Sequence, residues 1–341
     1  MLGPLIEQLP FKPLNITHLL DPSGHYVLNL DPEFPLIIQS CSYDAPLEAT
    51  PLNWHEHLEI FVPISGSGVF RVGAGLIPFT PGDMLVVDNL KLHGLHRFDG
   101  PRRRAIVIRF APELIYQFNS PLCDYLYLTP FYCREESTPP IIPTAHRLAP
   151  ALRGAFCRLL SCYFNSTEGL GFQVGCKTHL IELLHVMTKY FGYWQVTPGA
   201  FQHKRSEAQR LGILHEYLRV NYGEKIDVST AAGIIGMAPT NFMKYFKKIT
   251  GDTFIQYLTK ARLRSAARML MESDLSVARI AHDVGFSDQS YFDRKFRSFF
   301  GKTPREFRMQ LSGRRKAPDP SHQFFPNPQN RSIRAINDVT V

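Results

Sequence analysis

The sequence predicts an α+β multidomain protein with an N-terminal β-barrel, a helical connector and a C-terminal all-α domain that carries two helix-turn-helix motifs. Three observations lead to this fold class. Short apolar runs separated by Gly, Pro and Asp turns occupy residues 36–110. Amphipathic helical stretches follow to about residue 191. Beyond residue 206 a helical pattern occurs twice, about 50 residues apart.

The segment from Ser276 to Phe296 has the pattern of two short helices joined by a turn. Apolar residues between Val277 and Val284 recur at spacings of three, four and seven, which is the stripe of one buried helical face. Gly285 is suited to end the first helix, because a residue without Cβ accepts a left-handed conformation. Ser287 is a good N-cap for the second helix. The outward side chains of that helix include an amide, a hydroxyl and a guanidinium, which suit base edges in the major groove of DNA.

A second copy of this pattern lies upstream, from Val228 to Phe246. Gly236 corresponds to Gly285 at an offset of 49 residues, and Phe246 corresponds to Phe296 at an offset of 50 residues. A single-residue insertion in the turn explains the change of offset. The duplication predicts two similar helix pairs, which we call the first and the second helix pair.

The two helix pairs together resemble the DNA-binding domain of the AraC/XylS family of bacterial transcription regulators. The resemblance runs from about Leu211 to Arg308 and is nearly free of gaps through the second pair. It implies a regulator of transcription, an activator, with operator DNA and RNA polymerase as partners. The first pair departs from the family pattern at two positions. Gly233 stands in mid-helix, where glycine costs about 1 kcal/mol relative to alanine, and Ala238 replaces the usual capping Ser or Thr. We therefore expect the first pair to be the more loosely formed.

Outward positions on the second helix of each pair are the candidate DNA contacts. Distance from Gly236 and Gly285 assigns the base contacts, and Arg294 paired with guanine is the strongest of them, because a bidentate pair gives about 1–3 kcal/mol of discrimination. The predicted base contacts are Thr240, Asn241, Met243, Lys244, Gln289, Ser290, Asp293 and Arg294. The predicted phosphate contacts are Lys247, Lys248, Arg297, Lys302 and Arg305.

The helix expected between the two pairs, Phe254–Met271, sets their separation. Eighteen residues span about 27 Å. This length holds two recognition helices roughly one DNA turn, about 34 Å, apart. The sequence therefore predicts that both helices enter successive major grooves on one face of the duplex.

Charge and cysteine usage agree with a DNA-binding protein of the cytoplasm. Residues 204–316 carry a net charge of +11, whereas the rest of the chain carries −3, the expected footprint of a nucleic-acid-binding module. None of the six cysteines forms a Cys-x-x-Cys pair, so free thiols are expected. Residues 1–9 lack the basic region of a secretion signal, and no apolar run approaches a membrane span of about 20 residues. No membrane association is expected.

The predicted barrel, residues 36–112, contains a second resemblance. The string His55-x-His57-x-Glu59, followed by Ile64–Gly68, Pro81–Asp83 and His93, is similar to the cupin-type ligand-binding domain common in the same family. It implies a small-molecule effector, with a sugar as the leading candidate because many relatives sense carbon sources. The candidate ligand-binding residues are Trp54, His55, His57, Glu59, Phe70 and His93. Trp54 and Phe70 are predicted as an apolar or sugar-stacking wall of the pocket, and a plain core role for either is the equal alternative.

The same polar residues raise the question of a metal. Alternate residues of a strand share one face, so His55, His57 and Glu59 could converge, and imidazole with carboxylate suits a first-row transition metal. Metal-binding cupins usually place the Glu further from the second His. We therefore predict a polar pocket with no metal and no other cofactor, and a protein that is not an enzyme. The alternative is a metal-binding barrel with a catalytic or redox-sensing role.

The remaining segments complete the predicted organisation. The helical stretches Ala145–Phe164 and Phe172–Phe191 either pair two chains, as the predicted homodimer requires, or pack on their own barrel. Domain boundaries are predicted as follows: an N-terminal arm (1–35), the barrel (36–112), a helical connector (113–195), a linker (196–205), the DNA-binding domain (206–311) and a disordered tail (312–341).

Overall fold

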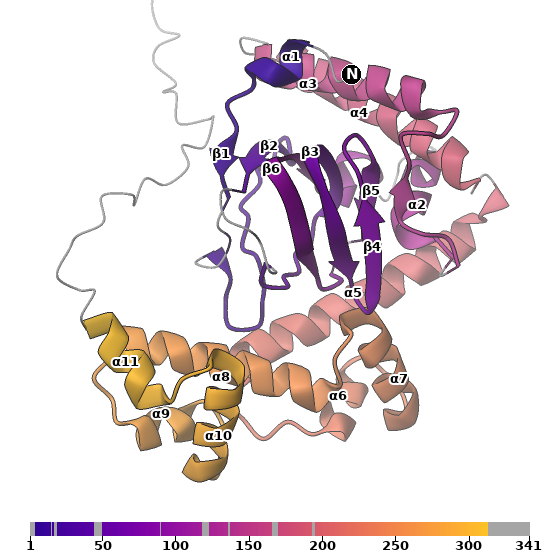
Figure 1. Cartoon of the computed structure of the whole chain (residues 1–341). Helices are drawn as coiled ribbons and strands as arrows, with labels where there is room; N and C mark the ends of the chain where they lie inside the picture. Colours follow the sequence, from indigo (N-terminus) through magenta and orange to yellow (C-terminus); the bar gives the residue numbers. More distant parts are fainter. Residues whose placement is uncertain are drawn as a thin grey trace, which may run out of the picture.

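The computed structural model describes residues 4–14, 16, 19–43, 50–88, 90–117, 123–135, 137–165, 170–192 and 195–312. Figure 1 shows a central sheet with the helices α3 (Ala149–Asn165) and α4 (Leu170–Phe191) at one end and a group of C-terminal helices at the other. The predicted disordered tail lies outside the described residues from 313 onward. The predicted N-terminal arm contains a short helix, α1 (Pro4–Gln8), and a short strand.

The described residues form one seven-stranded sheet, with order β1-β2-β6-β3-β5-β7 and with β4 paired to β3. The pairings are antiparallel except for β1 with β2. The strands are β1 (Lys12–Pro13), β2 (Leu36–Ser42), β3 (Leu58–Val72), β4 (Gly75–Phe79), β5 (Met84–Val87), β6 (His93–Phe110) and β7 (Ile141–Ile142).

The prediction of a closed barrel is wrong, because this sheet is open. Closing a barrel requires the two end strands to pair along their length. Here the end strands β1 and β7 have two residues each, and they pair only with β2 and β5. The predicted β-rich region, residues 36–110, does contain long strands of the sheet, whereas closure depends on edge segments that carry no strand signal of their own.

The Gly-rich segment Ser65–Gly68 forms no turn, because β3 continues through it as one long strand. The register between β3 and β6 shifts between Pro63 and Phe70, as in a β-bulge. The glycines allow a close approach of β6. A Cβ on Gly68 would lie 2.0 Å from the carbonyl oxygen of Arg97, and one on Gly66, whose φ is +84°, would lie 2.6 Å from that of Asp99.

The helices α3 and α4 confirm the two predicted amphipathic stretches. Their apolar faces, with Phe156 and Leu183 fully buried, belong to the same core as the sheet residues Ile60 and Ile106. These faces therefore pack on the sheet of their own chain. Short helical segments at η2 (Pro112–Leu114), η3 (Asp124–Leu128) and α2 (Thr129–Tyr132) join the sheet to α3.

One long helix, α5 (Pro198–Asn221), connects the sheet to the C-terminal helices. Most of the predicted linker, residues 196–205, is therefore helical. Phe201 belongs to the core beneath the sheet, whereas Leu214 and Leu218 belong to the core of the C-terminal helices. Because α5 packs in both cores, a movement of the sheet core displaces the C-terminal helices more directly than it would through a flexible linker.

The C-terminal helices follow the predicted order. They are α6 (Val228–Ile234), α7 (Pro239–Thr250), α8 (Phe254–Glu272), α9 (Val277–Asp283), α10 (Gln289–Phe300) and α11 (Pro304–Ser312). The turn glycines at equivalent places in the two helix pairs, Gly236 and Gly285, have φ values of +66° and +89°. None of the helices among the described residues combines the length and apolarity needed to cross a membrane.

The helix caps differ between the pairs. The prediction that Ser287 is the N-cap of α10 is wrong. Asp288 is the N-cap, and its Oδ1 accepts a hydrogen bond from the backbone N–H of Tyr291. Aspartate is as good a cap as serine, and α10 begins one residue later than the pattern predicted. The N-cap of α7 is Ala238, which has no side-chain oxygen for this role. The first pair therefore lacks a hydrogen bond that the second pair has.

Candidate DNA-binding surface and sensor site

The outer faces of α7 and α10 carry the predicted DNA contacts. Seven of the eight predicted base-contacting side chains are exposed, namely Thr240, Asn241, Met243, Lys244, Gln289, Ser290 and Arg294. Asp293 is half-buried, and burial raises the pKa of its carboxyl group. The inner faces are closed by fully buried phenylalanines at matching positions of the repeat, Phe242, Phe246, Phe292 and Phe296. Two aromatic residues four positions apart thus fix which side of each helix faces solvent.

Basic residues continue this surface through the last turns of α7 and α10, and after α10 to Lys302 and Arg305. All five predicted phosphate contacts are exposed, namely Lys247, Lys248, Arg297, Lys302 and Arg305. The guanidinium of Arg294 lies 6.0 Å from the ring centroid of Tyr291, one turn earlier in α10. This surface presents hydrogen-bond donors above two buried aromatic faces, an arrangement suited to a polyanion.

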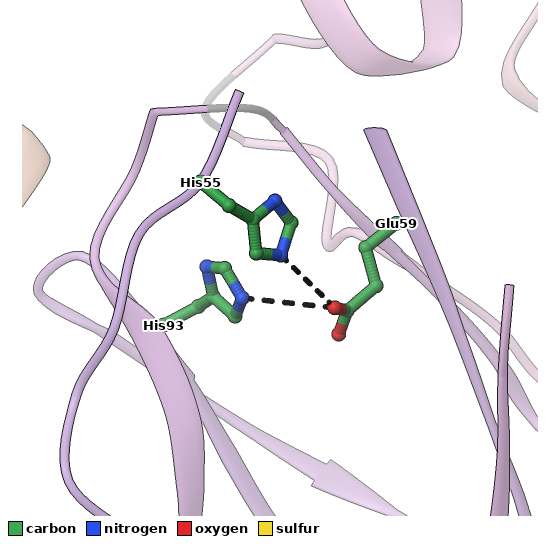
Figure 2. A group of neighbouring side chains, drawn as sticks. All are labelled: His55, Glu59 and His93. Atoms are coloured by element: carbon green, nitrogen blue, oxygen red, sulfur yellow. Dashed lines mark hydrogen bonds and ion pairs between the residues drawn. The ribbon is translucent and has the colours of Figure 1, made fainter. Parts of the chain in front are cut away.

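His55, Glu59 and His93 form a buried polar cluster beside strands β3 and β6, where the sequence predicted a ligand pocket (Figure 2). Nε2 of His55 lies 3.1 Å from Oε2 of Glu59, and Nε2 of His93 lies 3.8 Å from the same oxygen. Arg109 of β6 donates from Nε to this oxygen at 2.6 Å. The structure thus brings together three of the predicted polar residues and adds Arg109, which the sequence reasoning missed although a lone arginine in the apolar run 105–110 is a visible signal.

His57 does not join the cluster. Its carbonyl oxygen accepts a hydrogen bond from Nδ1 of His55 at 2.9 Å, but its ring is not among the converging groups. The predicted alternation fails because β3 begins at Leu58, so both histidines precede the strand.

The charges of the cluster follow from burial. Burial lowers the pKa of His55 to about 3, so its ring is neutral near pH 7. Burial opposes ionisation of Glu59, yet the positive charge of Arg109 holds the pKa of Glu59 below its usual range. Since Nδ1 of His55 donates to a carbonyl, its neutral Nε2 is an acceptor that faces a carboxylate oxygen. Nε2 of His93 is buried and has no hydrogen-bond partner among the described residues, while its Nδ1 bonds to the carbonyl of Lys91.

These converging acceptors are the atoms that could hold a metal ion. His55, Glu59 and His93 form such a group among the described residues, with ligand atoms within 4.8 Å of one another. Histidines held through Nδ1 by carbonyl groups are typical of metal ligands, and the donor set suits a first-row transition metal. Arg109 already supplies a positive charge to Glu59, so the site has a neutralising partner without an ion.

The C-terminal helices are similar to domains of known proteins. A family model described as a helix-turn-helix domain matches residues 231–310. The transcriptional activator RhaS of Pectobacterium carotovorum is 34% identical over 122 residues, which cover 35% of this chain and 44% of RhaS. The regulator YdeC of Bacillus subtilis, itself uncharacterized, is 19% identical over 270 residues, which cover 77% of this chain and 87% of YdeC. This stretch is an AraC/XylS-type helix-turn-helix domain.

The likeness extends to solved structures. A transcriptional regulator of Chromobacterium violaceum with an AraC-type DNA-binding domain is 25% identical with a TM-score of 0.30, and the match covers 32% of this chain and 96% of that chain. The chain spans less than half the length of RhaS.

The AraC/XylS-type domain packs against the sheet through residues that the sequence analysis assigned differently or missed. Trp54, predicted as a pocket wall, lies between the rings of His25 and His215, at 4.2 Å from each ring centroid. Tyr257 of α8 donates its hydroxyl hydrogen to the carbonyl of Ser23 at 2.8 Å and lies 3.0 Å from Nδ1 of His215. No sequence pattern links these positions, which are up to 234 residues apart.

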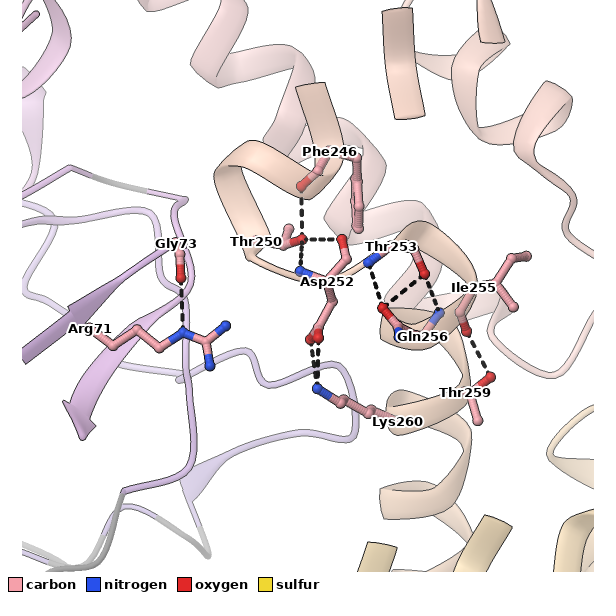
Figure 3. A network of polar contacts seen from close by, with 10 residues as sticks. All are labelled: Arg71, Gly73, Phe246, Thr250, Asp252, Thr253, Ile255, Gln256, Thr259 and Lys260. Atoms are coloured by element: carbon pink, nitrogen blue, oxygen red, sulfur yellow. Dashed lines mark hydrogen bonds and ion pairs between the residues drawn. The ribbon is translucent and has the colours of Figure 1, made fainter. Parts of the chain in front are cut away.

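A second contact joins the sheet to the end of α7. Figure 3 shows Arg71 and Gly73 facing the segment Thr250–Thr253 between α7 and α8. A Cβ on Gly73 would lie 2.8 Å from the carbonyl oxygen of Ile249, and one on Gly251 would lie 3.0 Å from that of Gly73. The turn between β3 and β4 thus directly contacts α7, the second helix of the first pair.

The space inside the sheet is small. The cavity beside Glu59 and His93 measures about 40 Å³. Phe70, predicted as a pocket wall, packs in the surrounding core against Phe61, with ring centroids 4.9 Å apart. A volume of this size holds about one water molecule, which leaves no room for a sugar in this arrangement.

Proposed function

We propose that the protein is an effector-responsive, sequence-specific DNA-binding transcription regulator. The observation that carries this proposal is the exposure of matching polar positions on α7 and α10, above buried phenylalanines, in a region of net charge +11. The two recognition helices would enter successive major grooves of one operator, with α8 of 19 residues, about 28 Å long, between them. Activation, contact with RNA polymerase and a homodimeric state belong to the same proposal.

The sheet domain would control how the AraC/XylS-type domain meets DNA. Both contacts described above, at Trp54 and at Gly73, couple the sheet to helices of that domain. An effector acts through such contacts only if it binds one arrangement of the two halves better than another. Family resemblance favours a sugar inside the sheet, but the volume there argues for a different effector site.

Selection of genomic DNA tests the proposal. The purified full-length chain is incubated with sheared genomic fragments in the presence of heparin, and the retained fragments are sequenced. We expect a recurrent motif with two half-sites about one helical turn apart. Retention of fragments without any shared motif, or loss of all retention at physiological salt, would refute sequence-specific recognition.

A second candidate function is favoured by the acceptor atoms that converge on Glu59. In this alternative the sheet binds a first-row metal through His55, Glu59 and His93, and the ion serves redox sensing or catalysis. Elemental analysis of the full chain purified without chelator tests it. Stoichiometric metal that is lost in the His93→Ala variant would support this function, and a metal-free protein that cannot be loaded with Zn²⁺ would exclude it.

A further inference from the structure

We propose that a cavity between α1, α3 and the end of the sheet binds an organic anion with an apolar body, and that this cavity is the effector site. The effector role rests on the proposed function, whereas the binding itself does not. The cavity has a volume of about 760 Å³, within the range of small-molecule sites of about 300–1,000 Å³. It lies on the face of the sheet that packs on α3, away from the His55 cluster, and in Figure 1 α1 and α3 lie together above the strands.

The apolar part of the wall comes from several elements. Ile6 of α1, Met84 of β5, Ile142 of β7 and Leu152 of α3 each expose 3% of their surface or less. These four apolar positions are buried, whereas Glu7, Pro81 and Arg102 of the same lining are exposed, so the cavity opens to solvent. The apolar body of a ligand placed there would remove its own surface from water, at about 25 cal/mol per Å².

The polar part of the wall is cationic. Arg102 and Arg104 of β6 and Arg153 of α3 line the cavity, and Glu7 is the one carboxylate among its lining residues. The lining thus carries two more positive than negative charges. An arginine side chain presents five donors in a planar fork that matches carboxylate and phosphate groups.

These three guanidinium groups have no acceptor among the described residues. The guanidinium of Arg104 lies over the ring of Phe11, 4.8 Å from its centroid. Arg103 lies between the two on the strand and points to the opposite face, because successive side chains alternate. It does have acceptors, the carbonyl oxygens of Tyr43 and Gly100. Among these three neighbouring arginines of β6, Arg103 therefore has acceptors, whereas Arg102 and Arg104 have none within the described residues.

A further polar atom of the wall has no partner. The hydroxyl oxygen of Ser65 is buried and makes no hydrogen bond within the described part of the chain. Buried hydroxyl groups are normally hydrogen-bonded. An anionic ligand in the cavity would supply acceptors for the arginines and for Ser65 at the same time.

The position of the cavity links it to the DNA-binding half. α3 and Phe201 of α5 belong to one core. α5 continues to His215, which stacks on Trp54. A ligand that fixes α1 and α3 against the sheet therefore acts on the core that holds the first half of α5.

Isothermal titration of the full chain with a matched set of probes tests the site. The probes are 2-naphthoate, 2-naphthyl phosphate, the neutral 2-naphthamide and inorganic phosphate. We expect saturable binding of at least one of the two organic anions and none of the amide or of inorganic phosphate. The Arg104→Gln and Arg153→Gln variants should bind at least about tenfold more weakly, because each loses a charge-assisted contact. The control is Arg97→Gln on the same strand, where the side chain is 63% exposed and pairs with Asp99.

Different results of this titration bear on the binding site, on the effector role and on the proposed function. Stronger binding of the carboxylate or of the phosphate ester identifies the anionic group. Equal binding by Arg104→Gln and Arg97→Gln, binding of the amide, equal binding of inorganic phosphate, or no binding of either organic anion overturns the site. A ligand that binds but leaves operator affinity unchanged overturns the effector role alone. Failure of the chain to bind DNA selectively refutes the proposed function and leaves the titration result standing.

Discussion

The indole ring of Trp54 stacks on the imidazole of His215, with ring centroids 4.2 Å apart and an angle of 18° between the planes. Trp54 precedes the long strands of the sheet, and His215 lies in the half of α5 that belongs to the C-terminal core. Both side chains are buried, at 1% and 0% exposure. This pair is the centre of the contact between the sheet and the AraC/XylS-type domain.

Trp54→Ala should destabilise the protein by about 3–5 kcal/mol, the usual cost of truncating a buried tryptophan. The variant loses both ring stacks and leaves a cavity between the two halves. Urea denaturation followed by circular dichroism measures the change in the free energy of unfolding. The control is Val220→Ala, at a 63% exposed position of α5, the helix that carries His215. This variant should change stability by less than about 0.5 kcal/mol. Similar losses in both variants would contradict the role of the stack.

The contact should also weaken in acid. Burial lowers the pKa of His215 to about 3, and the hydroxyl of Tyr257 accepts the Nδ1 hydrogen. Unfolding returns the pKa to about 6.5. The unfolded state therefore binds more protons as the pH falls below about 6.5, and stability is lost in that direction. Between pH 7 and pH 5 the loss from this group is about 2 kcal/mol. The other titratable groups beside His215 are His25 and Glu56, whose side chains lie 2.9 Å apart.

Comparison with His215→Gln isolates this contribution. The variant keeps a donor for Tyr257 but does not titrate. The difference in free energy of unfolding between the native protein and the variant should shrink by about 2 kcal/mol from pH 7 to pH 5. A difference that is constant over this range would show that His215 does not titrate as its burial implies.

Local patterns predicted the elements that rest on local physics. The ranges of α3, α4 and α8 follow from apolar periodicity, and the turn glycines Gly236 and Gly285 follow from their place in the repeat. These features depend on neighbours within a few residues, so the sequence alone contains them.

Features that depend on distant contacts were missed. Trp54 reads equally well as a core residue or a pocket wall, and only the approach of His215 decides its role. The open sheet depends on the short pairings of β1 and β7. The cavity below α1 is built from side chains of at least four elements, and its unpaired arginines are recognisable only once Arg103 is seen to face the other way.

Arg294→Ala should weaken binding to the operator by about 1–3 kcal/mol and leave binding to random duplex nearly unchanged, because the side chain is exposed on α10 at a predicted base contact. Lys247→Ala, in the last turn of α7, should weaken both alike and reduce the salt slope by about 1. Fluorescence anisotropy at several salt concentrations measures both effects. Lys295→Ala, which removes another cation near Tyr291, is the control. Equal losses on operator and random DNA for both Arg294→Ala and Lys247→Ala would refute this division.

The first helix pair should be open to stabilisation at one glycine and not at the next. Gly233 in α6 is exposed, and a Cβ there would meet no atom within 4 Å. Gly233→Ala should therefore raise the free energy of unfolding by about 0.5–1 kcal/mol, since alanine has less conformational freedom to lose. Gly236→Ala is a matched comparison, because a Cβ there also meets nothing but the backbone has φ of +66°. A left-handed conformation costs a non-glycine residue about 1–2 kcal/mol, so this second variant should be destabilised by that amount. Denaturant titration of both variants against the native chain measures the two changes, and equal effects of the same sign would show that backbone conformation does not set the stability of this turn.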